Sequence, residues 1–191
     1  MAVELKQPFI SPDEYWEIEQ ASETRSEYIS GEMFAMASPS RAHGDIVVNV
    51  GGELRSHLSG KPCRANAGLS VAAPGSFLVP DVVVYCEGAA FVRDNNVLQD
   101  PIVIVEVLSP STSGRDRGEK WFRYQNIPSL MHYVLIYQDE PRIEVFSRND
   151  GIWIYEDYDK LEGDFELTHI DCRLRLSDIY DGVAFEPSPS L

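Results

Sequence analysis

Hydrophobic residues form two short and nearly continuous runs near the middle of the chain, at residues 82–85 and 102–108. Runs of this length that are rich in valine and isoleucine are typical of strands buried on both faces. Asp81 comes directly before the first run, and Glu106 interrupts the second. Because burying an ionised carboxylate without a partner is costly, we expect Glu106 to have a cation, a proton or a metal beside it. If the two strands are neighbours, both carboxylates lie at one end of a sheet.

Apolar residues at helical spacing predict three helices. A short helix is expected to begin after Ser11, which with Glu14 forms a capping box, and to end by Ser22. The apolar positions of residues 43–58 predict a long helix, which a Gly-Lys-Pro sequence then stops. A second long helix is expected at residues 111–126.

Strands are predicted on both sides of these helices. The Ser-Gly pair between two strand-like segments predicts a tight hairpin over residues 25–36, with Glu27 in its first strand. Further strands are expected as a hairpin at 64–73, a buried strand at 131–137 and an antiparallel hairpin at 142–158. From residue 43 onward the order of elements predicts an α/β/α core with a mixed β-sheet. The N-terminal helix and hairpin and the C-terminal hairpin extend this core.

Length and composition predict a single domain over residues 1–191, since 191 residues with 43% hydrophobic content suffice for one core. We place that core at about residues 43–137 and expect the Pro- and Ser-rich end, 186–191, to be disordered. No apolar run reaches the length of a membrane helix, and the first residues lack the pattern of a signal peptide. We therefore expect a cytoplasmic protein.

The three cysteines, Cys63, Cys86 and Cys172, are odd in number and widely spaced, and none belongs to a CxxC pair. This spacing indicates neither a disulfide framework nor a structural zinc site. We expect buried thiols, the common state of a free cysteine.

The charge of the chain is uneven. A formal net charge of -15 argues against nonspecific coating of nucleic acid, and residues 139–171 hold 11 acids against three bases. Near the two candidate carboxylates the bases are in excess instead: Arg115, Arg117, Lys120 and Arg123 outnumber Asp116 and Glu119. A phosphate-bearing ligand is expected to approach from that side.

Five segments together resemble the Uma2 family, also called DUF820: RSEYISGEMFAM, SPSRAHGDIVVNV, LVPDVVVY, PIVIVEVLSPST and RDRGEKWFRYQNIPSLMHYVLI. The resemblance covers roughly residues 11–178. Its most specific part is VEVLSPST followed by a D-x-x-x-K-x-x-x-Y helix. Members of this family have a restriction-endonuclease-like fold of the PD-(D/E)XK nuclease superfamily, so the resemblance implies that fold and a nuclease.

The resemblance also implies a site. Asp81 and Glu106 would be the metal-binding carboxylates, Lys120 the catalytic lysine and Glu27 a further acid. The superfamily's usual lysine lies two residues after the second acid, where this chain has Leu108. Lys120 would therefore replace it from the following helix.

The chemistry of these side chains agrees with that assignment. Carboxylate oxygens are ligands that suit Mg²⁺ or Mn²⁺, and the backbone carbonyl of Val107 would be placed to add a third ligand. A metal there would polarise a phosphate and activate water, while Lys120 stabilises developing negative charge. Asp116, Lys120 and Tyr124 recur at intervals of four and share one helix face. We expect an endonuclease that hydrolyses phosphodiester bonds in a metal-dependent reaction, with DNA as its substrate.

Each assignment has a structural alternative. An aspartate beside a proline, such as Asp81, is also common in turns that have no catalytic role. Glu27 could instead lie on a strand face that is exposed to water. Lys120 could form an exposed ion pair with Asp116. His43 is most often a residue at a helix start, although its position ahead of an apolar helix face could direct it at the site.

The protein as a whole also has an alternative function. A catalytically inactive protein of the same fold could use its acidic surface to bind protein partners, since tight duplex binding usually needs a clear basic footprint. A homodimer would favour the nuclease, because two sites could address two strands.

Overall fold

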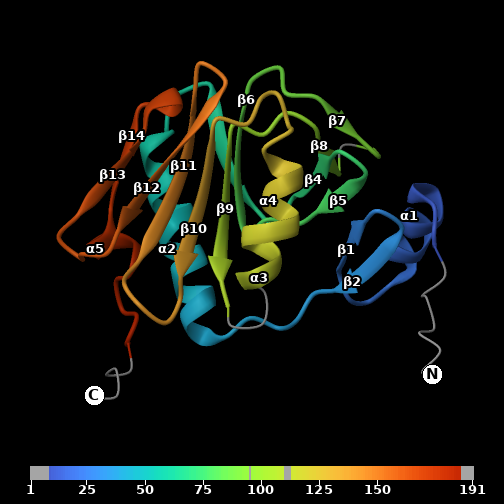
Figure 1. Ribbon diagram of the computed structural model, residues 1–191, viewed down its shortest axis with the longest axis horizontal. Helices are drawn as coiled ribbons and strands as arrows, with labels where there is room; N and C mark the ends of the chain where they lie inside the picture. Colours follow the sequence, from blue (N-terminus) through green and yellow to red (C-terminus); the bar gives the residue numbers. More distant parts are fainter. Residues whose placement is uncertain (1–8, 95, 110–112, 186–191) are drawn as a thin grey trace.

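The structure is a computed structural model that describes residues 9–94, 96–109 and 113–185 (Figure 1). At its centre lies a mixed sheet of six strands. In spatial order they are β12 (Ile152–Tyr158), β11 (Ile143–Asn149), β10 (His132–Tyr137), β9 (Val103–Leu108), β6 (Val82–Cys86) and β3 (Cys63–Ala67). Only β9 and β10 pair in parallel, and the other neighbours are antiparallel. The mixed α/β core predicted from the order of elements is thus present.

The parallel pair at the centre determines where the second helix lies. Two parallel neighbours need a crossover, and here the chain crosses through α3 (Ser113–Arg115), the π-helical turn η1 (Asp116–Lys120) and α4 (Trp121–Tyr124). We call these three segments the crossover helix. All six residues of β9 are buried, as its apolar run predicted. The first two residues of the predicted helix, 111 and 112, lie outside the described part of the chain.

The other face of the central sheet is covered by α2 (Arg41–His57) and by the C-terminal segments. These segments are β13 (Asp164–Leu167), the 3₁₀ turn η2 (Thr168–Ile170), β14 (Cys172–Arg175) and α5 (Leu176–Ile179). Ile46, Val50 and Leu54 of α2 pack on alternate residues of β6 and β9. The apolar periodicity of residues 43–58 therefore identified the buried face of this helix.

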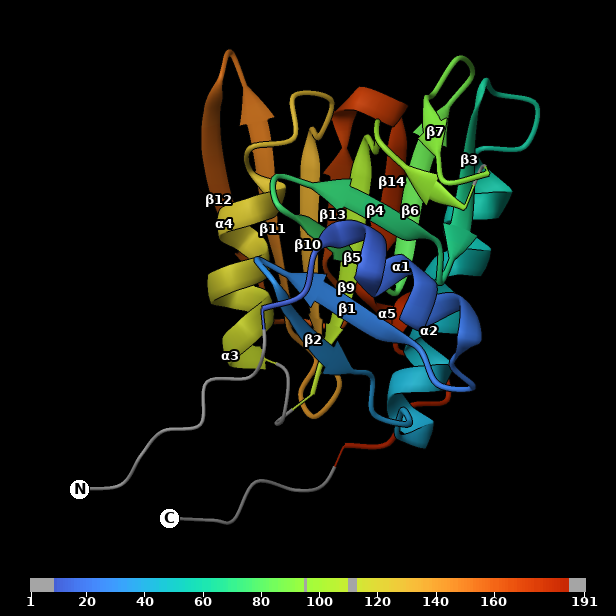
Figure 2. The ribbon, with the colours of Figure 1, turned by 90° about the vertical axis from the view of Figure 1, so that its right-hand side faces the viewer.

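A second sheet lies in front of the central one in the view of Figure 2. Its strands, in spatial order, are β2 (Glu32–Ala35), β1 (Ser26–Ile29), β5 (Ser76–Leu78), β4 (Ser70–Ala73), β8 (Val97–Leu98) and β7 (Phe91–Val92), with α1 (Pro12–Ala21) beside it. Ile29, Val71 and Leu78 of this sheet share a core with Tyr124 of the crossover helix. The predicted capping box of Ser11 and Glu14 is present in α1, and the β1–β2 hairpin is also confirmed.

The predicted hairpin over residues 64–73 is wrong. β3 pairs with β6 in the central sheet, whereas β4 pairs with β5 in the second sheet. The chain changes sheets at Gly68, which has a φ of 69° that favours glycine. The Pro-Gly turn that follows closes a β4–β5 hairpin instead.

The expectation of three free thiols is also wrong. Cys63 and Cys86 form a disulfide between β3 and β6, and only Cys172 is free among the cysteines. The two strands pair so that Cys63 lies directly opposite Cys86, a register that the spacing of cysteines in the sequence does not reveal. Cys172 is buried as expected, and burial raises the pKa of its thiol to about 11.

In the described part of the chain, no helix is long and apolar enough to span a membrane. The C-terminal residues 186–191, for which we expect disorder, lie outside the described residues.

Candidate active site

Asp81 and Glu106 lie together at one end of the central sheet. Asp81 comes directly before β6, and its Oδ2 accepts a hydrogen bond of 2.6 Å from the backbone N–H of Val107. Val107 follows Glu106 in the neighbouring strand, so the carboxylate of Asp81 bonds the chain one residue from Glu106. The predicted placement of both carboxylates at one sheet end is therefore present.

His43 holds the other oxygen of Asp81. Its Nε2 lies 2.9 Å from Oδ1, and both side chains are 17% exposed. His43 occupies the first turn of α2, where its backbone N–H donates to the hydroxyl of the N-cap Ser40. The helix start thus directs His43 at the site, the second of the two placements that the sequence allowed.

Glu106 points to the opposite face from α2, toward the crossover helix. It is buried, and its Oε1 accepts hydrogen bonds of 3.1 Å from both Lys120 Nζ and Tyr124 OH. The geometry follows from the topology, because a crossover between two parallel strands packs on the sheet and brings one helix face over β9. Asp116, Lys120 and Tyr124 share that face, as their spacing predicted, and all three are buried.

Lys120 is surrounded by three carboxylates. Its Nζ lies 2.8 Å from Glu27 Oε1, 3.1 Å from Glu106 Oε1 and 3.1 Å from Asp116 Oδ1. Lys120 is 6% exposed, so the alternative of a solvated ion pair on the helix surface is wrong. Its pair with Asp116 exists but is buried and shared with the other two acids.

A π-helical turn positions this lysine. The backbone N–H of Trp121 donates to the carbonyl of Asp116, five residues back, and the hydroxyl of Tyr133 donates to the same carbonyl. Such turns are rare in helices and are frequent at functional sites. Tyr133 was not among the residues expected at the site, because within an apolar strand its hydroxyl gives no signal in the sequence.

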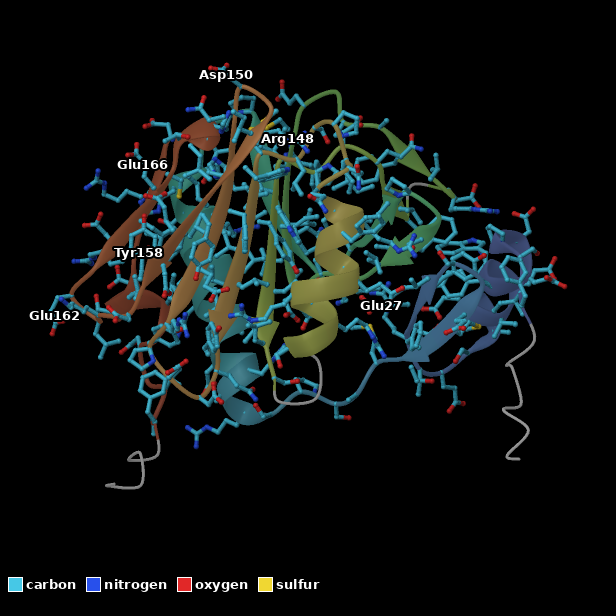
Figure 3. All side chains as sticks on the ribbon, viewed as in Figure 1. Glu27, Arg148, Asp150, Tyr158, Glu162 and Glu166 are labelled. Carbon is cyan, nitrogen blue, oxygen red and sulfur yellow. A yellow bond between two sulfur atoms is a disulfide. The ribbon has the colours of Figure 1, made fainter. Side chains whose placement is uncertain are left out.

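Glu27 enters the site from the second sheet. All four residues of β1 are buried, so the alternative of a strand face that meets water is wrong. The Oε1 of Glu27 accepts a hydrogen bond of 2.9 Å from the backbone N–H of Val79, and the side chain lies beside the crossover helix (Figure 3). Glu27 thereby links the two sheets through Lys120.

The site holds more negative than positive charge. Burial raises the pKa of Glu106 well above its usual value; the charge of Lys120 opposes this shift, while Asp116, Asp81 and Glu27 add to it. Burial disfavours the charge of Lys120, but the attraction of its three acidic neighbours outweighs it and raises the pKa of the ammonium group. The site therefore favours a charged lysine and either a proton or a further cation among the acids.

One acidic oxygen in this group lacks a hydrogen bond. Asp116 Oδ1 is buried and has no hydrogen-bond partner among the described residues, although the ammonium of Lys120 is at ion-pair distance. Across residues 9–94, 96–109 and 113–185, no three His, Cys, Asp or Glu side chains are arranged as a ready-made metal site. Both oxygens of Asp81 and one oxygen of Glu106 are already engaged by protein groups.

Known proteins match this chain over most of its length. The model of the Uma2 family, described as "putative restriction endonuclease", matches residues 12–171. Two uncharacterized proteins of Synechocystis are similar: slr1290 is 32% identical over 93% of this chain and 95% of its own length, and sll1609 is 29% identical over 81% and 90%.

A solved structure has the same fold. The crystal structure of a "putative nuclease belonging to DUF820" from Anabaena variabilis superposes with a TM-score of 0.76, covers 92% of this chain and 99% of its own, and is 20% identical. The restriction-endonuclease-like fold implied by the sequence is thus confirmed. By the match of its family model and the similarity of its relatives, this chain belongs to the Uma2 family.

Proposed function

We propose that the protein is a metal-dependent endonuclease that hydrolyses phosphodiester bonds in DNA. One observation carries the proposal: a buried lysine has three acidic neighbours, one of which is Glu106, and the carboxylate of Asp81 bonds the strand of Glu106. A structural ion pair needs one acid for one base. Membership of a family described as "putative restriction endonuclease" supports the same conclusion.

The residues present fit a divalent cation by charge and by chemistry. Glu27, Glu106 and Asp116 surround one lysine, and Asp81 adds a fourth carboxylate whose charge also acts on Glu106. Burial raises the pKa of Glu106, the nearby acids raise it further, and a cation would offset their repulsion. Carboxylate and carbonyl oxygens are the ligands that Mg²⁺ and Mn²⁺ prefer. Asp81, Glu106 and the carbonyl of Val107 would hold the ion, which when bound would polarise the scissile phosphate and activate water.

The other residues orient these groups. His43 and the N–H of Val107 fix both oxygens of Asp81, and Tyr124 fixes Glu106. The ammonium of Lys120 supplies positive charge where the phosphate becomes more negative during attack by water. Asp81 and His43 are the partly exposed members, so a phosphate would enter from their side.

Cleavage of DNA tests the proposal. Supercoiled, linear duplex and single-stranded DNA are incubated with Mg²⁺ or Mn²⁺ and with the wild-type protein, Glu106→Ala or Glu162→Ala. Glu162 is an exposed acid on the far side of the molecule from the crossover helix, which makes it a matched control (Figure 3). We expect cleavage that needs metal, survives Glu162→Ala and is lost in Glu106→Ala. Folded wild-type protein that cuts none of these substrates would contradict the proposal.

A second candidate function is that of an acidic protein-binding module. Every acid between residues 139 and 171 except Glu144 is exposed, and Glu162 and Glu166 lie on the outer side of the C-terminal strands (Figure 3). This function predicts binding of a basic protein that Glu106→Ala leaves unchanged. For the nuclease, a homodimer would place two sites on two strands, and sedimentation velocity would measure it.

A further inference from the structure

A second charged cluster lies beside the candidate active site on the same face of the sheet. Leu135 of β10 pairs in register with Glu106 of β9 on one side and with Glu144 of β11 on the other. Residues in register point to the same face, and neighbouring strands are about 4.8 Å apart. Glu144 therefore lies about 10 Å from Glu106 along the sheet.

Glu144 is almost completely buried and organises this cluster. Its Oε1 accepts hydrogen bonds from Arg117 Nη2 at 2.6 Å, from Tyr137 OH at 3.1 Å and from Tyr155 OH at 3.1 Å. Arg117 directly follows Asp116 in the π-helical turn, so the turn that aims Asp116 at Lys120 also aims Arg117 at β11. The two clusters are thus connected by adjacent residues of the crossover helix.

Two guanidinium groups lie close to one aromatic ring. Arg117 and Arg142 have their guanidinium carbons 5.2 Å and 5.1 Å from the centre of the Tyr137 ring. Asp157 holds Arg142 through two hydrogen bonds of 2.9 Å. Both arginine side chains remain accessible, with 39% and 34% of their surface exposed.

Arg117 retains hydrogen-bonding capacity. In the described part of the chain its hydrogen bond to protein is the one from Nη2 to Glu144, and a guanidinium carries five N–H groups. The planar fork of a guanidinium matches two phosphate oxygens and is weakly hydrated, so it binds phosphate at low cost when it is already fixed in place. Glu144 and the Tyr137 ring fix it here.

We propose that Arg117 and Arg142 form a second subsite, which binds a backbone phosphate of the nucleic acid next to the phosphate under attack. This inference rests on the proposed nuclease function. Three carboxylates, those of Glu144, Asp157 and the more distant Glu140 at 3.8 Å, face the two guanidinium charges. The subsite therefore sets the register of the strand more than it adds bulk affinity. The subsite would also let this acidic chain bind a phosphate about 10 Å along the sheet from Glu106.

Equilibrium binding tests the subsite without turnover. The parent is Glu106→Gln in Mg²⁺, and fluorescence anisotropy measures its affinity for labelled single-stranded and duplex DNA over a series of salt concentrations. Arg117→Gln and Arg142→Gln are added to it singly. Arg173→Gln is the matched control, because Arg173 is an exposed arginine of β14 that is also paired with acids, but it lies on the strands that cover the other face of the sheet.

We expect Arg117→Gln to weaken binding about 5- to 10-fold and to reduce the slope of log K against log salt by about 0.7–0.9, the value for one lost phosphate contact. Arg117→Lys keeps the positive charge but lacks the planar guanidinium. Its affinity for DNA should therefore lie between that of the parent and that of Arg117→Gln. Arg173→Gln should bind as the parent does. Thermal unfolding of each variant shows whether the fold is intact.

Two results would overturn the subsite, and they are distinguishable. If wild-type protein cleaves DNA but folded Arg117→Gln binds and responds to salt as Arg173→Gln does, the subsite is wrong and the nuclease stands. If wild-type protein neither cleaves nor binds DNA, the nuclease proposal fails and the subsite fails with it.

Discussion

Lys120 and Glu27 are in contact at 2.8 Å although they belong to different parts of the fold, the crossover helix and the second sheet. Neither side chain would be stable in this place alone. The charge of a lysine that is only 6% exposed must be balanced by its acidic neighbours, and the charges of the buried carboxylates must be balanced by the lysine. The stability of the protein and the arrangement of its site therefore depend on the same contacts.

Replacing Lys120 by methionine should destabilise the protein strongly. The substitution leaves Glu27, Glu106 and Asp116 buried without a cation, and breaking a buried ion pair in this way costs about 3–5 kcal/mol of unfolding free energy. Urea denaturation at neutral pH measures the change. Lys160→Met, at an exposed position, is the control and should have little effect. Equal stability of the two variants would show that the buried cluster is not maintained by Lys120.

Replacing Glu106 by glutamine should stabilise the metal-free protein at neutral and alkaline pH. Burial raises the pKa of Glu106 in the folded protein above its usual value of 4.5. Protonated Glu106 therefore contributes its full stabilisation below pH 4.5, and this stabilisation is lost as the pH rises through the folded pKa. The neutral amide avoids that loss. Each kcal/mol gained raises the melting temperature by about 2–4 °C in a chain of this size.

The measurement is thermal unfolding from pH 4.5 to pH 9 in the presence of a chelator. The wild-type melting temperature should fall relative to Glu106→Gln as the pH increases. Curves that stay parallel over this range would mean that Glu106 keeps its charge without penalty. A stabilised but inactive Glu106→Gln would further indicate that the site is maintained at a cost to stability.

His132 should make the protein sensitive to acid. It is fully buried, and burial together with the neighbouring His169 lowers the pKa of its imidazole to about 4. A histidine with a lowered folded pKa stabilises the fold above its unfolded value of 6.5, and this stabilisation is lost as the pH falls toward 4. The loss amounts to about 3 kcal/mol, since one pKa unit corresponds to about 1.4 kcal/mol.

Urea denaturation between pH 6.5 and pH 4 of wild-type protein and His132→Gln checks this expectation. The variant should lose less stability than the wild type over that interval. His57→Gln serves as the control, because His57 is half-exposed on α2. Identical pH dependence in all three proteins would contradict a buried neutral His132.

The Cys63–Cys86 disulfide should stabilise the edge of the central sheet. It joins residues separated by 23 positions, and closing a loop of that length in the unfolded chain is worth about 3 kcal/mol in the chain-entropy description. Thermal unfolding with and without a reductant should show a lower melting temperature after reduction. Cys63→Ser should unfold at the temperature of the reduced protein and should not respond to reductant. Cys172→Ser, which leaves the disulfide intact, is the control for loss of a cysteine.

Much of the fold was predictable because local signals and global packing agree. The apolar run of β9, the spacing of buried residues in α2 and the capping box of α1 each occur where the sequence placed them. The two-sheet arrangement was not predictable, because the turn at Gly68 can either close a hairpin or send the chain to another sheet. The same holds for the disulfide, which depends on the register of β3 against β6.

The sequence indicated which residues belong to the candidate site better than it indicated the contacts between them. Asp81 was singled out by its place directly before one apolar run and Glu106 by its interruption of another, whereas Lys120 and Glu27 were implied by the family resemblance. The burial of Lys120 among Glu27, Glu106 and Asp116 needed the crossover helix to dock on the sheet, a tertiary event with no local signal. Glu144 was counted with the acidic surface, since an isolated acid in a strand does not show which face it takes.

The position of the crossover helix in the sequence determines when the site can be completed during synthesis. During synthesis the acids of the site are made before Lys120, and β10, which completes the parallel pair, follows later still. Until that helix docks, Glu27 and Glu106 lack the ammonium of Lys120, which contacts both of them in the folded protein. A growing chain that ends before β10 lacks the parallel pair on which the crossover helix packs. The proposed cutting activity therefore requires a chain that has been made and folded through β10.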